Sequence, residues 1–344
     1  RARCDSRLRT LRFSRAEWSV PPADRNTPAV DAALGLAHAL ATSVEELFAD
    51  NSLAVIAALG GSLRDGAPVR LGRVADQLVA VELADHGIAG ATWAKPDGVL
   101  EGGELRLFPG ASPASTVLAG CEPAIGVAET MLDGLGPRSL LAISAPTDTA
   151  LHALAAGGIH ASVVHGLQDE LPEPPVPVIR WHLARWQVGL AVATKLRDHS
   201  LEALLRCDVP LAQRDPAAAS QQALERARAV AGIGPTPPGP HASGHLDAAR
   251  LAATLNGAAI TTEGAAKAFD LSFRPLEDHV VEIWAAERWL DHTGINALAD
   301  LLTTKAFTQR IAHFGGYDLT HCGERVEPTD SPTGDGTYES SVGS

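Results

Sequence analysis

The sequence lacks the features that mark several common classes of protein. Its four cysteines are far apart and contain no C-x-x-C pair, which argues against a zinc site built on such pairs and against a secreted disulfide framework. No apolar run approaches the roughly 18 to 20 residues that span a membrane, and no secretion signal opens the chain. We therefore expect a cytoplasmic protein with reduced thiols, although a first residue of arginine leaves a removed signal peptide as an alternative.

Motifs of the common enzyme classes are also missing. The chain has no G-x-S-x-G elbow, no phosphate-binding P-loop and no G-x-G-x-x-G fingerprint. We therefore expect neither catalysis nor an organic cofactor. Cys121 follows a predicted strand and could be a nucleophile at a helix N-terminus, but no motif ties a histidine to it, so an inert thiol in a binding loop is favoured.

Positive charge is scarce and unevenly placed. The chain has 28 Lys and Arg against 41 Asp and Glu, a formal net charge of −13, which argues against a general nucleic-acid coat because phosphates would be repelled. The first 26 residues are the exception, with seven arginines against three acids. Five of these arginines are candidate DNA contacts, or else the solvated face of a helix: Arg7, Arg9, Arg12, Arg15 and Arg25.

The segment from Thr116 to Gly166 is the most informative part that is present. It contains two successive units of strand, small-residue loop and helix. In the first unit a buried strand leads through Gly120 and Cys121 to Pro123, a residue suited to the first turn of a helix. In the second unit Ser144, Thr147 and Thr149 lie near a helix start. Free N–H groups at two helix N-termini predict an anion site, and the alternative is a parallel sheet whose loops bind nothing.

The rest of the pattern predicts an α/β protein with smaller parts at each end. Residues 51–112 are expected to form a connector with short strands, including 69–74 and 77–83. From about residue 114 strands alternate with helices, as in parallel α/β units. Further strands are expected at 176–179, 189–192, 258–260 and 280–284, and further helices at 217–231, 246–255 and 295–312. The polar residues 323–344 predict a disordered tail.

Residues 27–48 resemble the last helices of an Xre/Cro-like helix-turn-helix domain. The resemblance rests on Pro28, on residues 33–40 (ALGLAHAL) and on residues 43–48 (SVEELF), and residues 7–15 resemble the first helix of that family. Only residues 16–26 lie between these parts, which is too short for the second helix and the recognition helix that read DNA. The resemblance therefore implies an incomplete helix-turn-helix in residues 1–50, in which DNA binding has been lost or is retained in altered form.

The sequence from about Gly66 to Asp318 is similar to the periplasmic-binding-protein-like domain attached to such heads in bacterial regulators, a family linked to molybdate and molybdopterin metabolism. The matching segments are residues 119–124 (AGCEPA), 150–161, 184–190, 214–216 (RDP), 244–249 (GHLDAA) and 316–318 (GYD). The resemblance implies a two-lobed (type II) domain over residues 113–322. Its first lobe would comprise 113–192 and 281–322, and its second lobe 193–280.

In such a domain the ligand lies in a cleft between the lobes, held by loops from both. The resemblance places the first-lobe loops at Gly120, Cys121, Glu122, Ser144, Thr147 and Thr149, and the second-lobe contacts at Arg214, Ser220, Ser243 and His245. An arginine supplies a fork of donors suited to an oxyanion or a carboxylate. Residues 215–220 (DPAAAS) depart from the glycine and second arginine of the relatives, which leaves weaker anion binding or another ligand open.

Two pairs of histidines have spacings that could suit a metal ion. His160 and His165 are five apart on a predicted strand, so they are expected to face opposite sides, and a Ser243-Gly244 turn separates His241 from His245. No metal site is therefore predicted. The function that the sequence favours is a ligand-sensing transcriptional regulator binding a small anionic metabolite or a molybdate-like oxyanion. A solute-binding protein for uptake and an enzyme of molybdenum-cofactor metabolism remain alternatives, and so does a homodimer.

Overall fold

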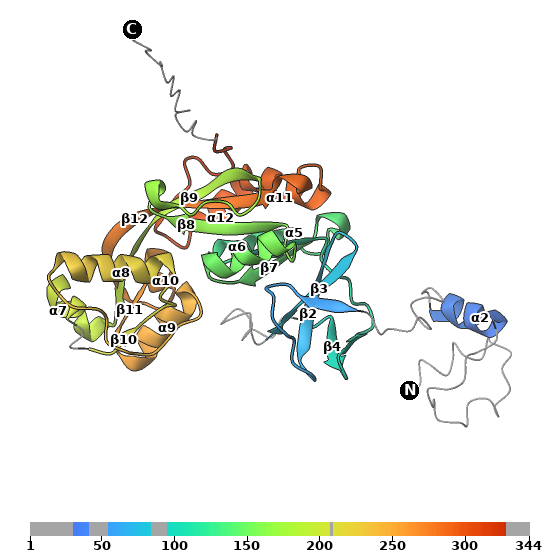
Figure 1. Ribbon diagram of the computed structural model, residues 1–344, viewed down its shortest axis with the longest axis horizontal. Coiled ribbons are helices and arrows are strands. Elements are labelled where there is room, and N and C mark those ends of the chain that lie inside the picture. Colours follow the sequence, from blue (N-terminus) through green and yellow to red (C-terminus); the bar gives the residue numbers. More distant parts are fainter. Residues whose placement is uncertain (1–29, 41–53, 84–94, 207–208, 328–344) are drawn as a thin grey trace, which may run out of the picture.

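The computed structural model describes residues 30–40, 54–83, 95–206 and 209–327. Their main feature is a large mixed sheet covered by helices, with a smaller sheet, antiparallel except for its edge strand β1 (Val55–Ala57), packed against it (Figure 1). No helix among these residues is long and apolar enough to cross a bilayer. In spatial order the large sheet contains β10 (Leu211–Ala212), β11 (Ala258–Thr262), β9 (Val178–Val192), β12 (Ser272–Ala286), β8 (Ala161–Gly166), β6 (Thr116–Gly120) and β7 (Leu140–Ser144), with β13 (Tyr317–Asp318) paired to β9.

The helices divide into two groups along this sheet. We call β6, β7 and β8 with their covering helices the first lobe, and β10 and β11 with theirs the second lobe. The first-lobe helices are α5 (Ala124–Leu132), α6 (Thr147–Ala156), α11 (Thr293–Leu302) and α12 (Lys305–Ala312). The second-lobe helices are α7 (Leu201–Leu205), α8 (Ala219–Val230), α9 (His245–Leu255) and α10 (Glu263–Ala268), at the left of Figure 1.

The predicted strand and helix units of the first lobe are confirmed. β6, β7 and β8 are parallel neighbours, and their continuous apolar sequence follows from burial on both faces. Leu118 packs with α5 and α11, whereas its neighbours Val117 and Ala119 pack with α6 and the small sheet. Gly120 ends β6, where a Cβ would lie 2.6 Å from the Cβ of Val163. A side chain at this position would therefore prevent the close approach of β6 and β8.

The small sheet matches the connector strands expected from the sequence. It has the order β1 (Val55–Ala57), β3 (Gln77–Glu82), β2 (Pro68–Val74), β4 (Gly98–Glu101) and β5 (Glu104–Leu107). Val74, Val79 and Val81 enter the same apolar cluster as Val117 and Leu141 of the large sheet. The small sheet thus covers part of the first lobe's face beside α6, and it does not act as a loose linker.

The prediction of two separate short strands at 176–179 and 189–192 was wrong, and the strand predicted at 280–284 is only part of a longer strand. The structure has two strands of 15 residues, β9 and β12, paired with each other along almost their whole length. At one end β12 pairs with β8 of the first lobe, and at the other end β9 pairs with β11 of the second. The lobes are therefore joined by continuous strands, and the polar residues inside these strands concealed them in the sequence. The predicted domain boundaries stay a prediction.

Near the two ends of the chain the predictions are confirmed only in part. Helix α2 (Val30–Leu40) forms as expected, but the expected helices at 7–15 and 43–48 lie outside the described residues. One helix does not make a helix-turn-helix, so the predicted remnant is not supported. At the other end, the predicted start of the disordered tail at residue 323 was too early, because residues 324 and 326 are still bonded to β9. The Glu324 carbonyl accepts from His182 N–H, and Val326 N–H donates to the Arg180 carbonyl. Residues 328–344 are not described.

Candidate functional site

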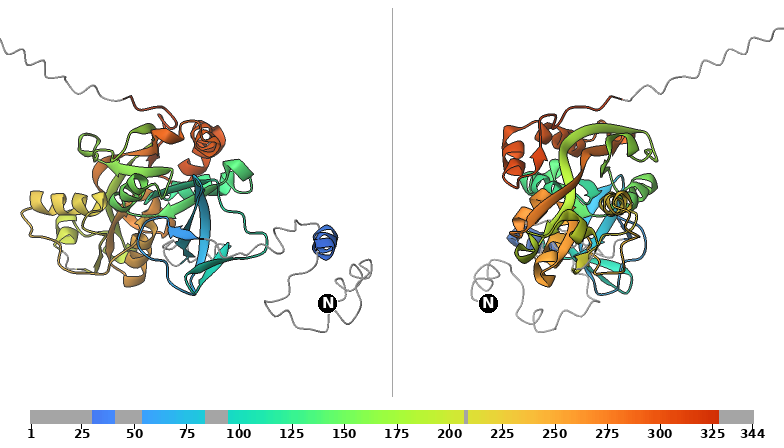
Figure 2. Two further views of the ribbon diagram at one scale, coloured as in Figure 1. Left: turned by 45° about the vertical axis from the view of Figure 1, so that its right-hand side comes forward. Right: turned by 90° about the vertical axis from the view of Figure 1, so that its left-hand side faces the viewer.

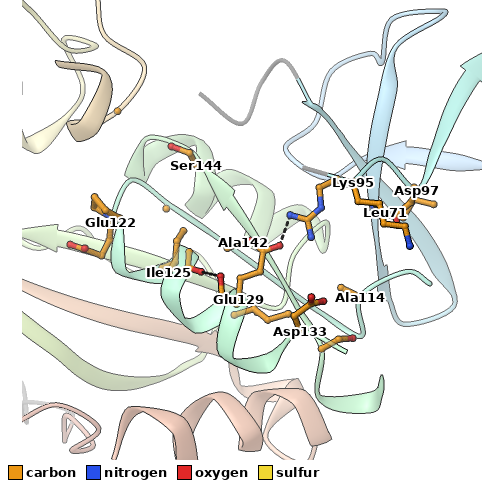
Figure 3. A pocket seen from close by; sticks show the side chains of 18 of the residues that line it. Leu71, Lys95, Asp97, Ala114, Glu122, Ile125, Glu129, Asp133, Ala142 and Ser144 are labelled. Carbon is orange, nitrogen blue, oxygen red and sulfur yellow. Dashed lines mark hydrogen bonds and ion pairs between the residues drawn. The ribbon is translucent and has the colours of Figure 1, made fainter. Parts of the chain in front are cut away.

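A cavity of about 790 Å³ lies where the first lobe, the second lobe and the small sheet meet. It is lined by the ends of β6 and β7, by one side of α5 and by the first turn of α9. Figure 3 shows Glu122 and Ser144 toward one end of the cavity and Lys95 and Asp97 of the small-sheet side toward the other. In the left view of Figure 2 the second lobe lies at the left and the small sheet toward the right.

Six of the ten predicted ligand-binding residues line this cavity. They are Gly120, Cys121, Glu122, Ser144, Ser243 and His245. Gly120 and Ser144 end adjacent parallel strands, where the carboxyl ends of an open sheet commonly form a ligand crevice. Ser243 and His245 flank Gly244, the N-cap of α9, and the first turn of α9 faces the cavity from the opposite lobe. Oγ of Ser144 would lie 3.5 Å from a Cβ built on Gly244, so the two lobes are in near contact here.

The other four predicted residues lie outside the cavity lining. Thr147 and Thr149 begin α6 and are half-buried. Arg214 and Ser220, in the second lobe, are only 1% exposed and are not among the lining residues. The predicted DNA contacts Arg7, Arg9, Arg12, Arg15 and Arg25 all fall in residues 1–29, outside the described part.

Arg214 is held by its backbone, while much of its guanidinium is unpaired. It follows β10, and its N–H donates to Oε1 of Gln221 on α8 at 2.9 Å. Its Nε and Nη1 atoms are buried and have no hydrogen-bond partner among the described residues. Arg214 is near enough to Cys121 for its positive charge to oppose the rise in the pKa of that thiol. No carboxylate of the described residues forms an ion pair with Arg214, so its charge lacks a bonded counter-ion within that part of the chain.

Cys121 lies in a cluster of histidines that the sequence did not indicate. Its Sγ is 2.9 Å from Nε2 of His165 on β8 and 3.8 Å from Nε2 of His245 on α9. His165 Nδ1 is 3.2 Å from Nδ1 of His279 on β12, and His279 Nε2 is 2.8 Å from Oε1 of Glu277. All three histidines are at most 2% exposed.

Burial sets the protonation of this cluster. It lowers the pKa of His165 and of His279 to about 4, and that of His245 well below its usual value, with Arg214 or a neighbouring histidine adding to the effect. Burial likewise raises the pKa of the Cys121 thiol, against the opposing effect of Arg214. At neutral pH the histidines are therefore uncharged and the thiol is protonated.

Glu122 lines the cavity, yet its oxygens are occupied by groups of the protein. They accept hydrogen bonds from Trp186 Nε1 at 2.7 Å, Tyr317 Oη at 2.6 Å and Ala124 N–H at 2.8 Å. Burial nevertheless raises the pKa of this carboxyl. Glu122 thus ties the start of α5 to β9 and β13, and its place in the structure indicates that it orients the loop around Cys121.

The sequence missed the polar wall that the small sheet supplies. Arg70 of β2 lines the cavity and is paired with Glu129 of α5, and Lys95 and Asp97 lie beside it. Asp97 Oδ2 accepts from Leu71 N–H at 2.9 Å. The sequence around residues 70 and 97 does not indicate that they lie next to the cavity, whose other lining residues, apart from their near neighbours, begin more than ten positions later in the chain. Only the packing of the small sheet on β6 brings them there.

Fold and cavity together define a two-lobed α/β ligand-binding domain. The PBP superfamily domain matches residues 131–303, half of the chain, and the chain belongs to this superfamily. Comparison with curated proteins finds no match.

Distant likenesses occur among solved structures. An ABC-type phosphate transport receptor from Vibrio cholerae is 9% identical with a TM-score of 0.41, over 59% of this chain and 99% of that one. The tungstate ABC transporter from Geobacter sulfurreducens is 14% identical with a TM-score of 0.43, over 58% and 97%. The regulatory domain of HypT from Salmonella typhimurium, with bromide bound, is 12% identical with a TM-score of 0.42, over 54% and 91%. These likenesses are too distant to transfer a ligand from one protein to another.

Proposed function

We propose that this chain is a receptor that binds a small anion between its lobes, next to Arg214. The observation that carries the proposal is the buried guanidinium of Arg214, whose Nε and Nη1 have no partner among the described residues. Burying an unpaired charge costs several kcal/mol, and proteins normally compensate that cost with an ion pair or hydrogen bonds. A bound anion would supply both.

The surroundings of Arg214 favour the same ligand charge. The first turn of α9 faces the cavity, and a helix N-terminus carries unsatisfied N–H groups and a partial positive charge. Ser144 adds a hydroxyl group from the first lobe, whereas the Ser243 hydroxyl already donates to Oδ2 of Asp247 at 3.1 Å. An anion held by both lobes would bind the closed arrangement best and would shift the protein toward it.

The cavity volume bears on the class of anion. About 790 Å³ is within the range of pockets that hold small organic molecules and leaves room around a single oxyanion. Arg70 and Lys95 can contact the far end of a longer ligand. The proposal therefore covers organic acids as well as a molybdate-like oxyanion.

We further propose that anion binding serves a cytoplasmic transcriptional regulator, and that the chain binds its ligand without converting it. The resemblance of residues 27–48 to a helix-turn-helix ending supports the regulatory role, and α2 lies within that segment. The match to the PBP superfamily domain supports a binding role. Selection from a random duplex library with the full chain tests the regulatory part. Loss of a selected sequence when the five N-terminal arginines become glutamine would support regulation, whereas no selection would favour an uptake role.

Anion binding itself is tested by calorimetry on the full chain with molybdate, tungstate, sulfate, phosphate and a panel of small carboxylates. A charged hydrogen bond contributes about 1.5–3 kcal/mol, so Arg214→Gln should weaken the binding of the best anion about 10- to 150-fold. Arg206→Gln, at an exposed arginine of the same lobe, is the control and should leave the affinity unchanged. Equal affinity of the wild type and Arg214→Gln for every anion that binds would refute the proposal, and so would the absence of any binding.

A further inference from the structure

We propose that Cys121, His165 and His245 form a binding site for a divalent transition metal such as Zn²⁺ or Co²⁺, at the junction of the two lobes. The three side chains each present one ligand atom, and these atoms lie within 4.8 Å of one another. Cys121 and His165 come from the first lobe, at the ends of β6 and β8, and His245 comes from the first turn of α9 in the second lobe. The proposed site is therefore assembled by tertiary structure alone.

The hydrogen bonds around His165 and His245 orient Nε2 of each ring toward Cys121 Sγ. His165 Nδ1 faces His279, and His279 in turn reaches Glu277 with Nε2 at 2.8 Å. When His279 Nε2 donates to Glu277, its Nδ1 accepts from His165 Nδ1, which leaves the lone pair of His165 Nε2 facing Cys121. A metal-ligating histidine characteristically donates its other N–H in this way, which fixes the ring and its tautomer.

His245 is oriented by a second, independent contact. Its Nδ1 lies 3.5 Å from Oγ1 of Thr261, whose hydroxyl already donates to the His245 carbonyl at 2.8 Å. The hydroxyl oxygen therefore faces His245 Nδ1 as an acceptor, and Nε2 is directed toward Cys121. Both imidazoles thus present Nε2 to the same thiol, which is the arrangement that a shared metal requires.

The ligand types select among metals. One thiolate and two imidazoles suit Zn²⁺ and its neighbours in the first transition row, and do not suit Mg²⁺ or Ca²⁺, which prefer oxygen. Metal–sulfur and metal–nitrogen bonds of about 2.3 and 2.0 Å require sulfur–nitrogen separations of about 3.5 Å in a tetrahedron. The observed 2.9 and 3.8 Å come within reach through small side-chain shifts.

Three protein ligands leave a fourth coordination position open, as in catalytic rather than structural zinc sites. Cys121 and His245 both line the cavity, so this position can face a bound molecule. Binding replaces the thiol proton, and the resulting thiolate offsets part of the metal charge next to Arg214. Because its ligands come from both lobes, the metal would also hold the lobes together. This inference is independent of anion binding. The metal site depends on Cys121, His165 and His245, whereas the anion site depends on Arg214.

The test is an anaerobic titration of the reduced, metal-free full chain with Co²⁺ in an anion-poor buffer. We expect a 1:1 complex with visible bands of four-coordinate cobalt and a near-ultraviolet thiolate charge-transfer band, release of about one proton, and displacement by Zn²⁺. Cys121→Ser should abolish the charge-transfer band and weaken binding by at least 100-fold. His165→Ala and His245→Ala should each weaken binding by more than tenfold.

Matched controls keep the result specific. Cys322→Ser replaces another free cysteine, and His241→Ala removes an exposed histidine four residues before a proposed ligand, so both should retain the wild-type bands. A wild type without a 1:1 complex, or a Cys121→Ser protein that keeps the charge-transfer band, would overturn the proposal. Arg214→Gln separates the two sites: it should lose anion affinity and still bind Co²⁺. Anion binding by a wild type that fails to bind Co²⁺ would overturn the metal site alone.

Discussion

Arg214 should make the ligand-free protein less stable than it could be, and its replacement by methionine should reveal this. Two buried guanidinium nitrogens, Nε and Nη1, lack a partner within the described residues. Each unsatisfied buried donor costs about 1–3 kcal/mol, so the two together cost about 2–6 kcal/mol. Methionine fills similar space without charge or donors. Arg214→Met should therefore raise the free energy of unfolding without ligand by about 2–6 kcal/mol.

Arg228 is the matched control, because it is a second buried arginine of the same lobe whose guanidinium is bonded. It is 3% exposed, and its Nε and Nη2 donate to the carbonyls of Gly234 and Pro235 at 2.8 and 3.0 Å. Arg228→Met should lower the free energy of unfolding by about 2–5 kcal/mol, because several backbone carbonyls lose their donors.

Urea unfolding monitored by tryptophan fluorescence measures both variants in the same anion-poor buffer. The wild type should then gain about 2.7 kcal/mol when an anion is added at 100 times its Kd, whereas Arg214→Met should gain much less. The reasoning about an unpaired charge would be refuted if Arg214→Met and Arg228→Met destabilised the protein to a similar extent.

Two further predictions concern the first lobe. His160 is fully buried, and burial, with the charges of His292 and Arg288, lowers its pKa to about 3, so its neutral form contributes stability above pH 6.5 that is lost as the pH falls toward 3. When the pH is lowered from 7 to 4.5, the free energy of unfolding of the wild type should fall by about 2–3 kcal/mol more than that of His160→Asn. Urea unfolding at each pH measures this difference, and an equal fall in both proteins would contradict the assignment. Gly120→Ala should destabilise the protein by about 1–3 kcal/mol because its Cβ would meet Val163, whereas Gly126→Ala on α5, with open space around it, should stabilise by about 0.5–1 kcal/mol in thermal unfolding.

The local pattern was sufficient for the elements of the first lobe. The strand at β6, the turn at Gly120 and the helix after Pro123 all follow from neighbouring residues, and so does the stop of α9 at Asn256, which adopts the left-handed conformation with φ of 51°. Burial on both faces gives such strands a continuous apolar sequence that can be recognised without a partner. The candidate loops of the cleft were predicted for the same reason.

The long strands β9 and β12 were not recognisable in this way. Their middle sections carry charged and half-buried residues, such as Arg185 and Glu277, that interrupt the apolar pattern. What keeps them extended is their pairing with each other and with strands of both lobes, and these contacts join residues about 90 positions apart. A local window of sequence does not contain that information.

By itself the sequence determined the alternation of strands and helices and the loops that end β6 and β7, because hydrophobic spacing and turn residues act over a few neighbouring positions. It also singled out Arg214 and Cys121. Only the tertiary structure decided what those residues meet: a guanidinium without a bonded counter-ion within the described residues, and a thiol beside His165 and His245. Cys121 is separated from these two histidines by 44 and 124 positions, and no local interaction encodes that meeting. It follows from the packing of two lobes along the shared strands β9 and β12.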